Sequence, residues 1–93
     1  MFEQILKRMR EKIRVSEYVM TTHAEEEMSE DELTIFDVER VILIGEIVER
    51  QRDHQTEEWK YMIRGQTIAG EDVVVAAKLS VTGVVVVITV YLI

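Results

Sequence analysis

Hydrophobic residues change their spacing along the chain near Gly45. Before Gly45 they recur at intervals of three and four residues, the period of an amphipathic helix. After Gly45 they come in short runs rich in valine and isoleucine, which are typical of strands. The pattern therefore predicts a helical first half and a sheet in the second half.

Three helices are predicted before Gly45. The first covers residues 2–15, and its apolar side is expected to dock on the core of the same chain; an extended piece at 17–20 follows it. Thr22 and Glu25 have the spacing of a capping box and begin a short second helix that ends at residue 28. Thr34 and Asp37 form a weaker capping box for a third helix. Gly45 ends this helix, because glycine accepts the left-handed backbone found at helix C-termini.

Four strands are predicted after Gly45, at residues 46–52, 59–66, 73–79 and 84–92, with turns at 53–58, 67–72 and 80–83. Helices followed by consecutive hairpins favour an α+β fold in which N-terminal helices pack on a four-stranded antiparallel sheet. Residues 1–93 are expected to form one domain, with an amphipathic helix at 1–16 and an α+β core at 17–93.

Alternation along the last two strands assigns their residues to two faces. A tight turn at Thr82–Gly83 would place Lys78 opposite Val87. One face is then wholly apolar and is expected to meet the helices: Val73, Val75, Ala77, Leu79, Val84, Val86, Ile88, Val90 and Leu92. The other face is mixed and is where a ligand or partner could bind: Val74, Ala76, Lys78, Ser80, Val85, Val87, Thr89 and Tyr91.

Three basic residues could gather on the mixed face. Alternation within residues 59–66 puts Lys60 and Arg64 on the same side of their strand. If that side also carries Lys78, the three form a cationic cluster with Thr89 and Tyr91 beside it. The register across residues 67–72 is not set by the sequence, so the opposite arrangement stays open.

Composition and charge limit the classes of function. The chain has 93 residues, 31% of them charged, and no cysteine, which excludes disulfides, thiolate nucleophiles and cysteine-ligated metals. The net charge of −7 opposes indiscriminate binding to nucleic acid, but it is uneven: +3 over residues 1–16, −11 over 17–58 and +1 over 59–93. A local basic face could therefore still bind a phosphate. The longest apolar run, at 84–93, is too short for a membrane helix, which predicts a cytoplasmic protein without membrane contact.

Few residues could carry chemistry. His23, in the first turn of the second predicted helix, is either a general acid or base or a histidine bonded to Glu27 or to backbone. His54 is expected to lie exposed in a turn. No second histidine has the spacing of a zinc motif, so we predict no metal and no cofactor. Trp59 is assigned to the core and not to a stacking surface.

Basic side chains on an open sheet suit metal-independent RNA cleavage, in which the 2′-hydroxyl attacks the neighbouring phosphate. The reaction needs a base, an acid and cations that stabilise the pentavalent phosphate. The candidate catalytic residues are His23, Lys78, Arg64 and Tyr91, and the candidate substrate-binding residues are Lys60 and Thr89.

Several segments together resemble a known family. They are Thr22–His23–Ala24–Glu25–Glu26–Glu27–Met28, residues 33–39 and Gly45–Glu46–Ile47–Val48–Glu49, followed by residues 59–61, 78–80 and 88–91. Over about residues 18–92 the chain resembles the domain of unknown function family numbered 4258. That family is similar to RelE-like and MqsR-like toxins of bacterial type II toxin–antitoxin systems. Its members commonly stand beside genes for zinc-finger antitoxins of the MqsA (YgiT) type.

The resemblance implies a RelE-like toxin fold, a ribonuclease activity without metal and an antitoxin partner. It marks His23, and it places Lys78 on the strand where related toxins often carry a catalytic cation. One departure is that many members have arginine where this chain has Glu27, in a His-Ala-x-x-Arg-Met pattern. An acid at this position would repel RNA.

Two hypotheses follow. The first is a toxin-like endoribonuclease that a partner antitoxin neutralises. It predicts that Lys78, Arg64, Lys60 and His23 gather at one solvent-facing groove. Separated side chains, or a salt bridge from Lys78 to an acid of the same chain, would count heavily against it. The second is a non-catalytic interaction module that dimerises or binds a partner through its sheet, at Val74, Val85 and Val87.

Overall fold

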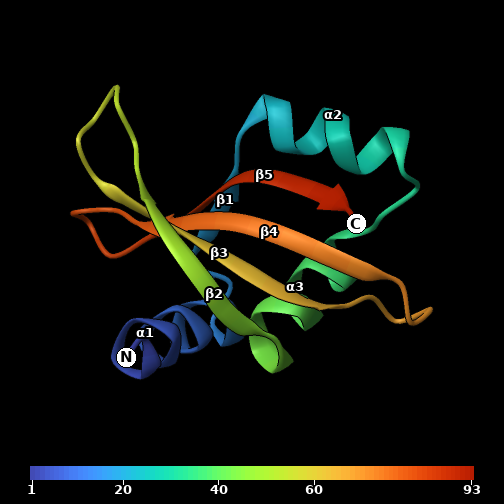
Figure 1. Cartoon of the computed structure of the whole chain (residues 1–93), viewed down its shortest axis with the longest axis horizontal. Coiled ribbons are helices and arrows are strands. Elements are labelled where there is room, and N and C mark those ends of the chain that lie inside the picture. The colour runs from blue at the N-terminus through green and yellow to red at the C-terminus, as the bar shows by residue number, and fades with distance from the viewer.

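The helical half of the sequence forms three helices in the computed structural model, which describes residues 1–93 (Figure 1). Helix α1 spans Glu3–Arg14, α2 spans Thr22–Glu30 and α3 spans Ile35–Ile44. At α3 the predicted capping box is confirmed: Thr34 Oγ1 accepts from the Asp37 N–H at 3.3 Å, and Asp37 Oδ2 accepts from the Thr34 N–H at 2.9 Å.

The predicted capping box of α2 is wrong. Thr21, not Thr22, is the N-cap: its backbone is extended, and its Oγ1 accepts from the Ala24 N–H at 3.1 Å. Thr21 is fixed there because its N–H donates to Val87 O and its hydroxyl donates to Ile88 O. Thr22 is therefore already the first helical residue. Glu25 is then four residues after the N-cap, not three, and does not form a capping box with it.

The strands form one five-stranded mixed sheet, which corrects the prediction of a four-stranded antiparallel sheet. The bounds are β1 Tyr18–Met20, β2 Glu46–Arg52, β3 Trp59–Gln66, β4 Asp72–Leu79 and β5 Val85–Leu92, in the spatial order β1-β5-β4-β3-β2. The extra strand is β1, the predicted extended piece, which pairs in parallel with β5. The paired residues Tyr18 and Val85 are 67 positions apart in the chain, so no hairpin signal in the sequence indicates this pairing.

A bulge in β5 changes the predicted faces of that strand. Val73↔Leu92 and Val75↔Val90 pair as a tight turn predicts, but Lys78 lies opposite Val86 and not opposite Val87. Ile88 has no partner on β4, because the register shifts by one residue between Ala76 and Ala77. The alternation of β5 therefore reverses at Ile88. The residues wrongly assigned to the helix-facing side are Val84, Val86 and Ile88, and Val85 and Val87 take their place in the core.

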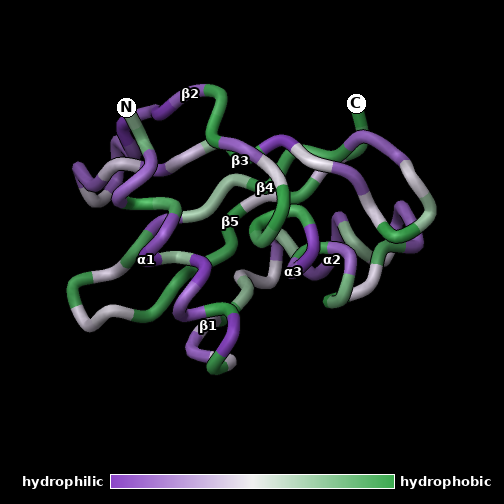
Figure 2. Tube along the Cα trace, turned by 90° about the horizontal axis from the view of Figure 1, so that it is seen from below, coloured by the Kyte–Doolittle hydropathy of each residue, from purple (hydrophilic) through white to green (hydrophobic).

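The core lies between the helices and one face of the sheet. It contains 15 buried residues, with contributions from all three helices and from β3, β4 and β5. Met9 and Ile13 of α1 belong to it, so the predicted docking of the first helix on its own chain is confirmed. Figure 2 shows the apolar positions concentrated along β4 and β5 at the centre of the molecule. None of the helices is both long and apolar enough to cross a membrane.

Two polar contacts tie the helices to the rest of the fold. Arg10 of α1 donates to Ile42 O at 3.0 Å and to Gly45 O at 2.7 Å, which satisfies carbonyls at the C-terminal end of α3. The Tyr18 hydroxyl of β1 donates to Glu39 of α3. Burial and the Glu39 carboxylate raise the pKa of Tyr18 to about 12.

Candidate functional site

Five of the six predicted site residues share the sheet face that is turned away from the helices. We call it the outer face. The register places Arg64, Val74 and Tyr91 in one row across the strands, and Met62, Ala76 and Thr89 in the next. Lys78 and Val86 follow in a third row, and Lys60 lies on the same side of β3 as Met62 and Arg64. The face left open by the sequence is thereby settled for Lys60, Arg64, Lys78, Thr89 and Tyr91.

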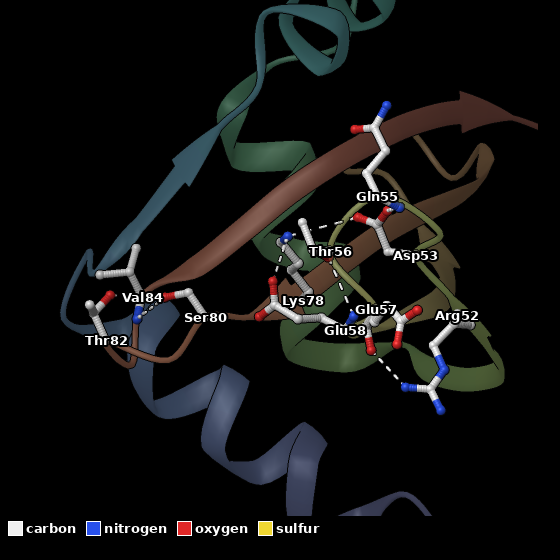
Figure 3. Close-up of polar contacts among 10 residues, drawn as sticks. All are labelled: Arg52, Asp53, Gln55, Thr56, Glu57, Glu58, Lys78, Ser80, Thr82 and Val84. Carbon is white, nitrogen blue, oxygen red and sulfur yellow. Dashed lines mark hydrogen bonds and ion pairs between the residues drawn. The ribbon is translucent and has the colours of Figure 1, made fainter.

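The cations of the outer face do not form the predicted cluster. Lys78 Nζ lies 3.1 Å from Glu58 Oε1 and 3.8 Å from Asp53 Oδ2, both in the β2–β3 connection (Figure 3). Arg64 Nη2 lies 3.8 Å from Asp72 Oδ2. Lys78 is four residues from Val74, the partner of Arg64, which separates the two rows by about 13 Å along the strand. The two cations are therefore held by acids at opposite ends of the face.

The ion pair at Lys78 is largely shielded from water. The Lys78 side chain is 13% exposed, and its carboxylate partners close the β2–β3 loop, in which the Asp53 N–H donates to Glu58 O at 2.8 Å. The Gln55 N–H and, less strongly, the Lys78 charge hold the pKa of Asp53 below its usual value. Lys78 therefore fastens this loop to β4. This contact weighs against the predicted role of Lys78 as a free cation for a phosphate.

The remaining candidates of the outer face are less engaged. Lys60 is half-buried and has no carboxylate oxygen within 4.0 Å. Thr89 is half-buried opposite Ala76, and Tyr91 is exposed opposite Val74. A cavity of about 330 Å³ opens beside Arg64 and is lined also by Gly45 and Gly65.

His23 lies outside the outer face, in the first turn of α2. Its side chain is 64% exposed, and its Nε2 lies 3.3 Å from Glu27 Oε1. The same Glu27 oxygen accepts the Val90 N–H at 3.0 Å. The interpretation of His23 as a histidine bonded to Glu27 therefore agrees with the geometry. His54 is exposed in the β2–β3 loop, as predicted. No group of three or more His, Asp or Glu side chains is arranged to hold a metal ion.

Sequence reasoning missed a second basic site, on the side of β2 and β3 that faces the helices. Arg50 and Arg52 of β2 stack on the ring of Trp59, with guanidinium carbons 4.0 and 4.5 Å from the ring centroid. Arg8 of α1 and Trp59 line one cavity of about 380 Å³. We call Arg8, Arg50, Arg52 and Trp59 the arginine cluster.

The arginine cluster differs from the outer face in its charge balance. None of its three guanidinium groups lies within 4.0 Å of a carboxylate oxygen. All three arginines are exposed. Arg52 donates a hydrogen bond to the uncharged backbone carbonyl of Glu57 at 2.6 Å. The alternation of residues along β2 contained a signal for this site, because it puts Arg50 and Arg52 on the same side of the strand. Across the β2–β3 hairpin they pair with Tyr61 and Trp59. The assignment of Trp59 to the core hid it.

Comparison with known families gives one match. The model of the family described as Domain of unknown function (DUF4258) matches residues 20–92, which include α2, α3, all of β2–β5 and the end of β1. The chain belongs to this family. The expected membership is confirmed. Comparison with curated proteins and with solved structures gives no significant match.

The position of Glu27 explains how this DUF4258 chain accommodates an acid where the family resemblance led us to expect an arginine. Helix α2 lies along β5 beyond the short β1 (Figure 1). Glu27 accepts the Val90 N–H there. An arginine has no acceptor atom and cannot make this bond. Glu27 thus has a structural function in this member of the family.

Proposed function

We propose that this protein binds RNA and that its arginine cluster contacts the phosphate backbone. The observation that carries the proposal is a set of three guanidinium groups without carboxylate partners: Arg50 and Arg52 stack on Trp59, and Arg8 lines a cavity together with Trp59. Guanidinium forks match phosphate oxygens in geometry and charge. Stacking on Trp59 restricts Arg50 and Arg52 before a ligand arrives, so less side-chain entropy is lost on binding.

The charge distribution supports a local site at Arg8, whereas Arg50 and Arg52 lie in residues 17–58, which carry a net charge of −11. A net charge of −7 repels a polyanion from most of the surface. Basic residues outnumber acids by three in residues 1–16, which include Arg8. Arginine beside an exposed aromatic ring is a combination found in proteins that bind single strands. On the outer face, by contrast, Lys78 and Arg64 each have a carboxylate oxygen within 4.0 Å.

Arg50→Gln with Arg52→Gln is expected to weaken binding of a single-stranded oligonucleotide about 25-fold at 0.1 M salt. Each phosphate contact on a single strand contributes about 0.7 to the steepness of log K against log salt concentration, so two lost contacts reduce it by about 1.4. Over the tenfold range from 1 M to 0.1 M salt, this difference amounts to about 25-fold in affinity. The measurement is fluorescence anisotropy of a labelled 2′-O-methyl RNA at several salt concentrations. The 2′-O-methyl group blocks cleavage, so binding is measured alone.

The matched control is Arg14→Gln with Arg40→Gln. It removes the same charge at two exposed arginines outside the arginine cluster. We expect the control to lose less than about threefold in affinity. Equal losses in both double variants would show that only bulk charge matters. Absence of binding by the wild-type chain at 50 mM salt would refute the proposal.

A second candidate function is the metal-independent endoribonuclease of a toxin–antitoxin system, with an antitoxin partner. It is favoured by one observation: Lys60, Arg64, Lys78, Thr89 and Tyr91 share the outer face. There the 2′-hydroxyl would attack phosphorus, the bond to the 5′-oxygen would break, and a cyclic phosphate would form. Tyr91 would transfer the protons on this face, and His23, which lies on α2, would have to act from outside it.

The test of this second candidate is cleavage of an end-labelled RNA in EDTA. Site-specific cleavage that both Lys78→Ala and His23→Ala abolish would establish it. Cleavage that survives both substitutions would come from a contaminant or from a different site. We expect no cleavage from the folded, partner-free chain, because Lys78 is held by Glu58 and Asp53. Of the three residues named for the interaction module, Val85 and Val87 lie in the chain's own core, and Val74 lies on the outer face.

A further inference from the structure

The cavity beside the arginine cluster is lined by both apolar and polar residues. It has a volume of about 380 Å³, within the range of small-molecule sites, and lies between α1 and the β3 and β4 strands. Two aromatic and three aliphatic residues line it: Trp59, Tyr61, Ile5, Leu79 and Val81. Arg8, Glu58 and Ser80 add polar groups. The cavity beside Arg64 has one apolar lining residue and lacks such walls.

We infer that this cavity binds one unstacked base of the RNA strand whose phosphates contact the arginine cluster. The inference rests on the proposed function, and it specifies which part of the RNA binds in the cavity. A nucleobase has a planar apolar surface with polar edges, which suits aromatic and aliphatic walls with a few polar groups. Arg8 and Trp59 belong to both the cavity and the arginine cluster, so base and phosphate would be bound side by side.

Two other ligand classes fit less well. A lipid surface would need the apolar side of α1, but Met9 and Ile13 are buried in the core and cannot enter a membrane. An acidic peptide would satisfy the arginines but offers no planar group for the apolar cavity. The combination of unpaired guanidinium groups with an aromatic-lined cavity is therefore best matched by a nucleotide unit.

The test compares two strands of equal length and charge. One is a 2′-O-methyl RNA, and the other is an abasic ribose-phosphate strand that lacks every base. We expect the base-bearing strand to bind about 5- to 150-fold more tightly, the range for one base against an aromatic site. It should also change the fluorescence of Trp59, the single tryptophan of the chain, whereas the abasic strand should change it little.

The outcomes separate the two proposals. Equal affinities for both strands would overturn the base site and leave phosphate binding intact. Failure of both strands to bind would refute the proposed function itself. Poly-glutamate that competes as well as RNA of the same charge would show that the ligand is an acidic peptide, and would overturn the inference.

Val81→Ser tests the cavity from the protein side. Val81 is 97% exposed at the cavity rim, so the change should not affect folding. We expect it to weaken binding of the base-bearing strand about threefold through lost apolar contact, and to leave the abasic strand unchanged. Val19→Ser is the control, because Val19 is an exposed apolar residue of β1 away from the cavity. Equal losses for both strands in Val81→Ser would contradict the inference.

Discussion

Val87→Asp is expected to lower the free energy of unfolding by more than about 4 kcal/mol, whereas Val86→Asp should change it by less than about 1 kcal/mol. The difference follows from the bulge at Ile88. Val87 lies opposite Ala77 and is fully buried in the core, so an aspartate there would be an unpaired charge without water. Val86 lies opposite Lys78 on the outer face, where a new carboxylate has a cation nearby and access to solvent.

Urea denaturation of both variants and the wild type provides the measurement. The two substitutions are one residue apart and chemically identical, so strand propensity and net charge are matched. A β5 strand without the bulge would place Val86 in the core and Val87 outside. Greater loss of stability in Val86→Asp than in Val87→Asp would therefore show that the bulge is wrong.

The sequence predicted every helix and the four antiparallel strands to within a few residues, because each is set by local periodicity, capping or turn residues. It placed an extended piece at residues 17–20 but did not predict its pairing with β5, nor the bulge. Both depend on contacts between residues far apart in the chain: Thr21 bonds to Val87 O and Ile88 O, and Tyr18 pairs with Val85. Local patterns carry no information about which distant backbone groups will meet.

The candidate site was predictable to a similar extent. Alternation correctly placed Lys60 and Arg64 on one side of their strand, since strand periodicity is a local property, but it left open whether Lys78 shares that side. It could not show that acids of the β2–β3 loop and of β4 would neutralise two of them. The reverse error occurred at Trp59. An aromatic residue at the start of a strand is usually core, but here the hairpin register sets arginines against it.

The ion pairs also bear on which surface is suited to an anion. A carboxylate already bound to Lys78 must be displaced before a phosphate can take its place, and the displaced acid then repels the phosphate. At the arginine cluster no such exchange is needed, because the guanidinium groups have no carboxylate partner within 4.0 Å. We therefore expect the arginine cluster, which contains none of the predicted site residues, to bind phosphate better than the outer face.

Gly45→Ala is expected to lower the free energy of unfolding by more than about 3 kcal/mol, the upper end of the cost of overpacking, or to prevent folding. The reason differs from the one that the sequence suggested. Gly45 has φ −80° and ψ −168°, which is extended and not left-handed. Instead, a methyl group there would lie 2.4 Å from both Arg64 O and Val41 O. These are backbone atoms, so no side-chain rotation can relieve the overlap.

The surroundings of Gly45 leave it no room to move. Its N–H donates to Val41 O at 2.8 Å, and its carbonyl accepts from Arg10 at 2.7 Å, so α3, α1 and β3 all meet at this residue. Gly70→Ala is the matched control: its φ of +87° costs about 1–2 kcal/mol in an L-residue, but no atom lies within 4 Å of the added methyl group. Denaturation midpoints should therefore fall much further for Gly45→Ala than for Gly70→Ala. Equal midpoints would mean that α3 and β3 do not approach each other as closely at Gly45 as described.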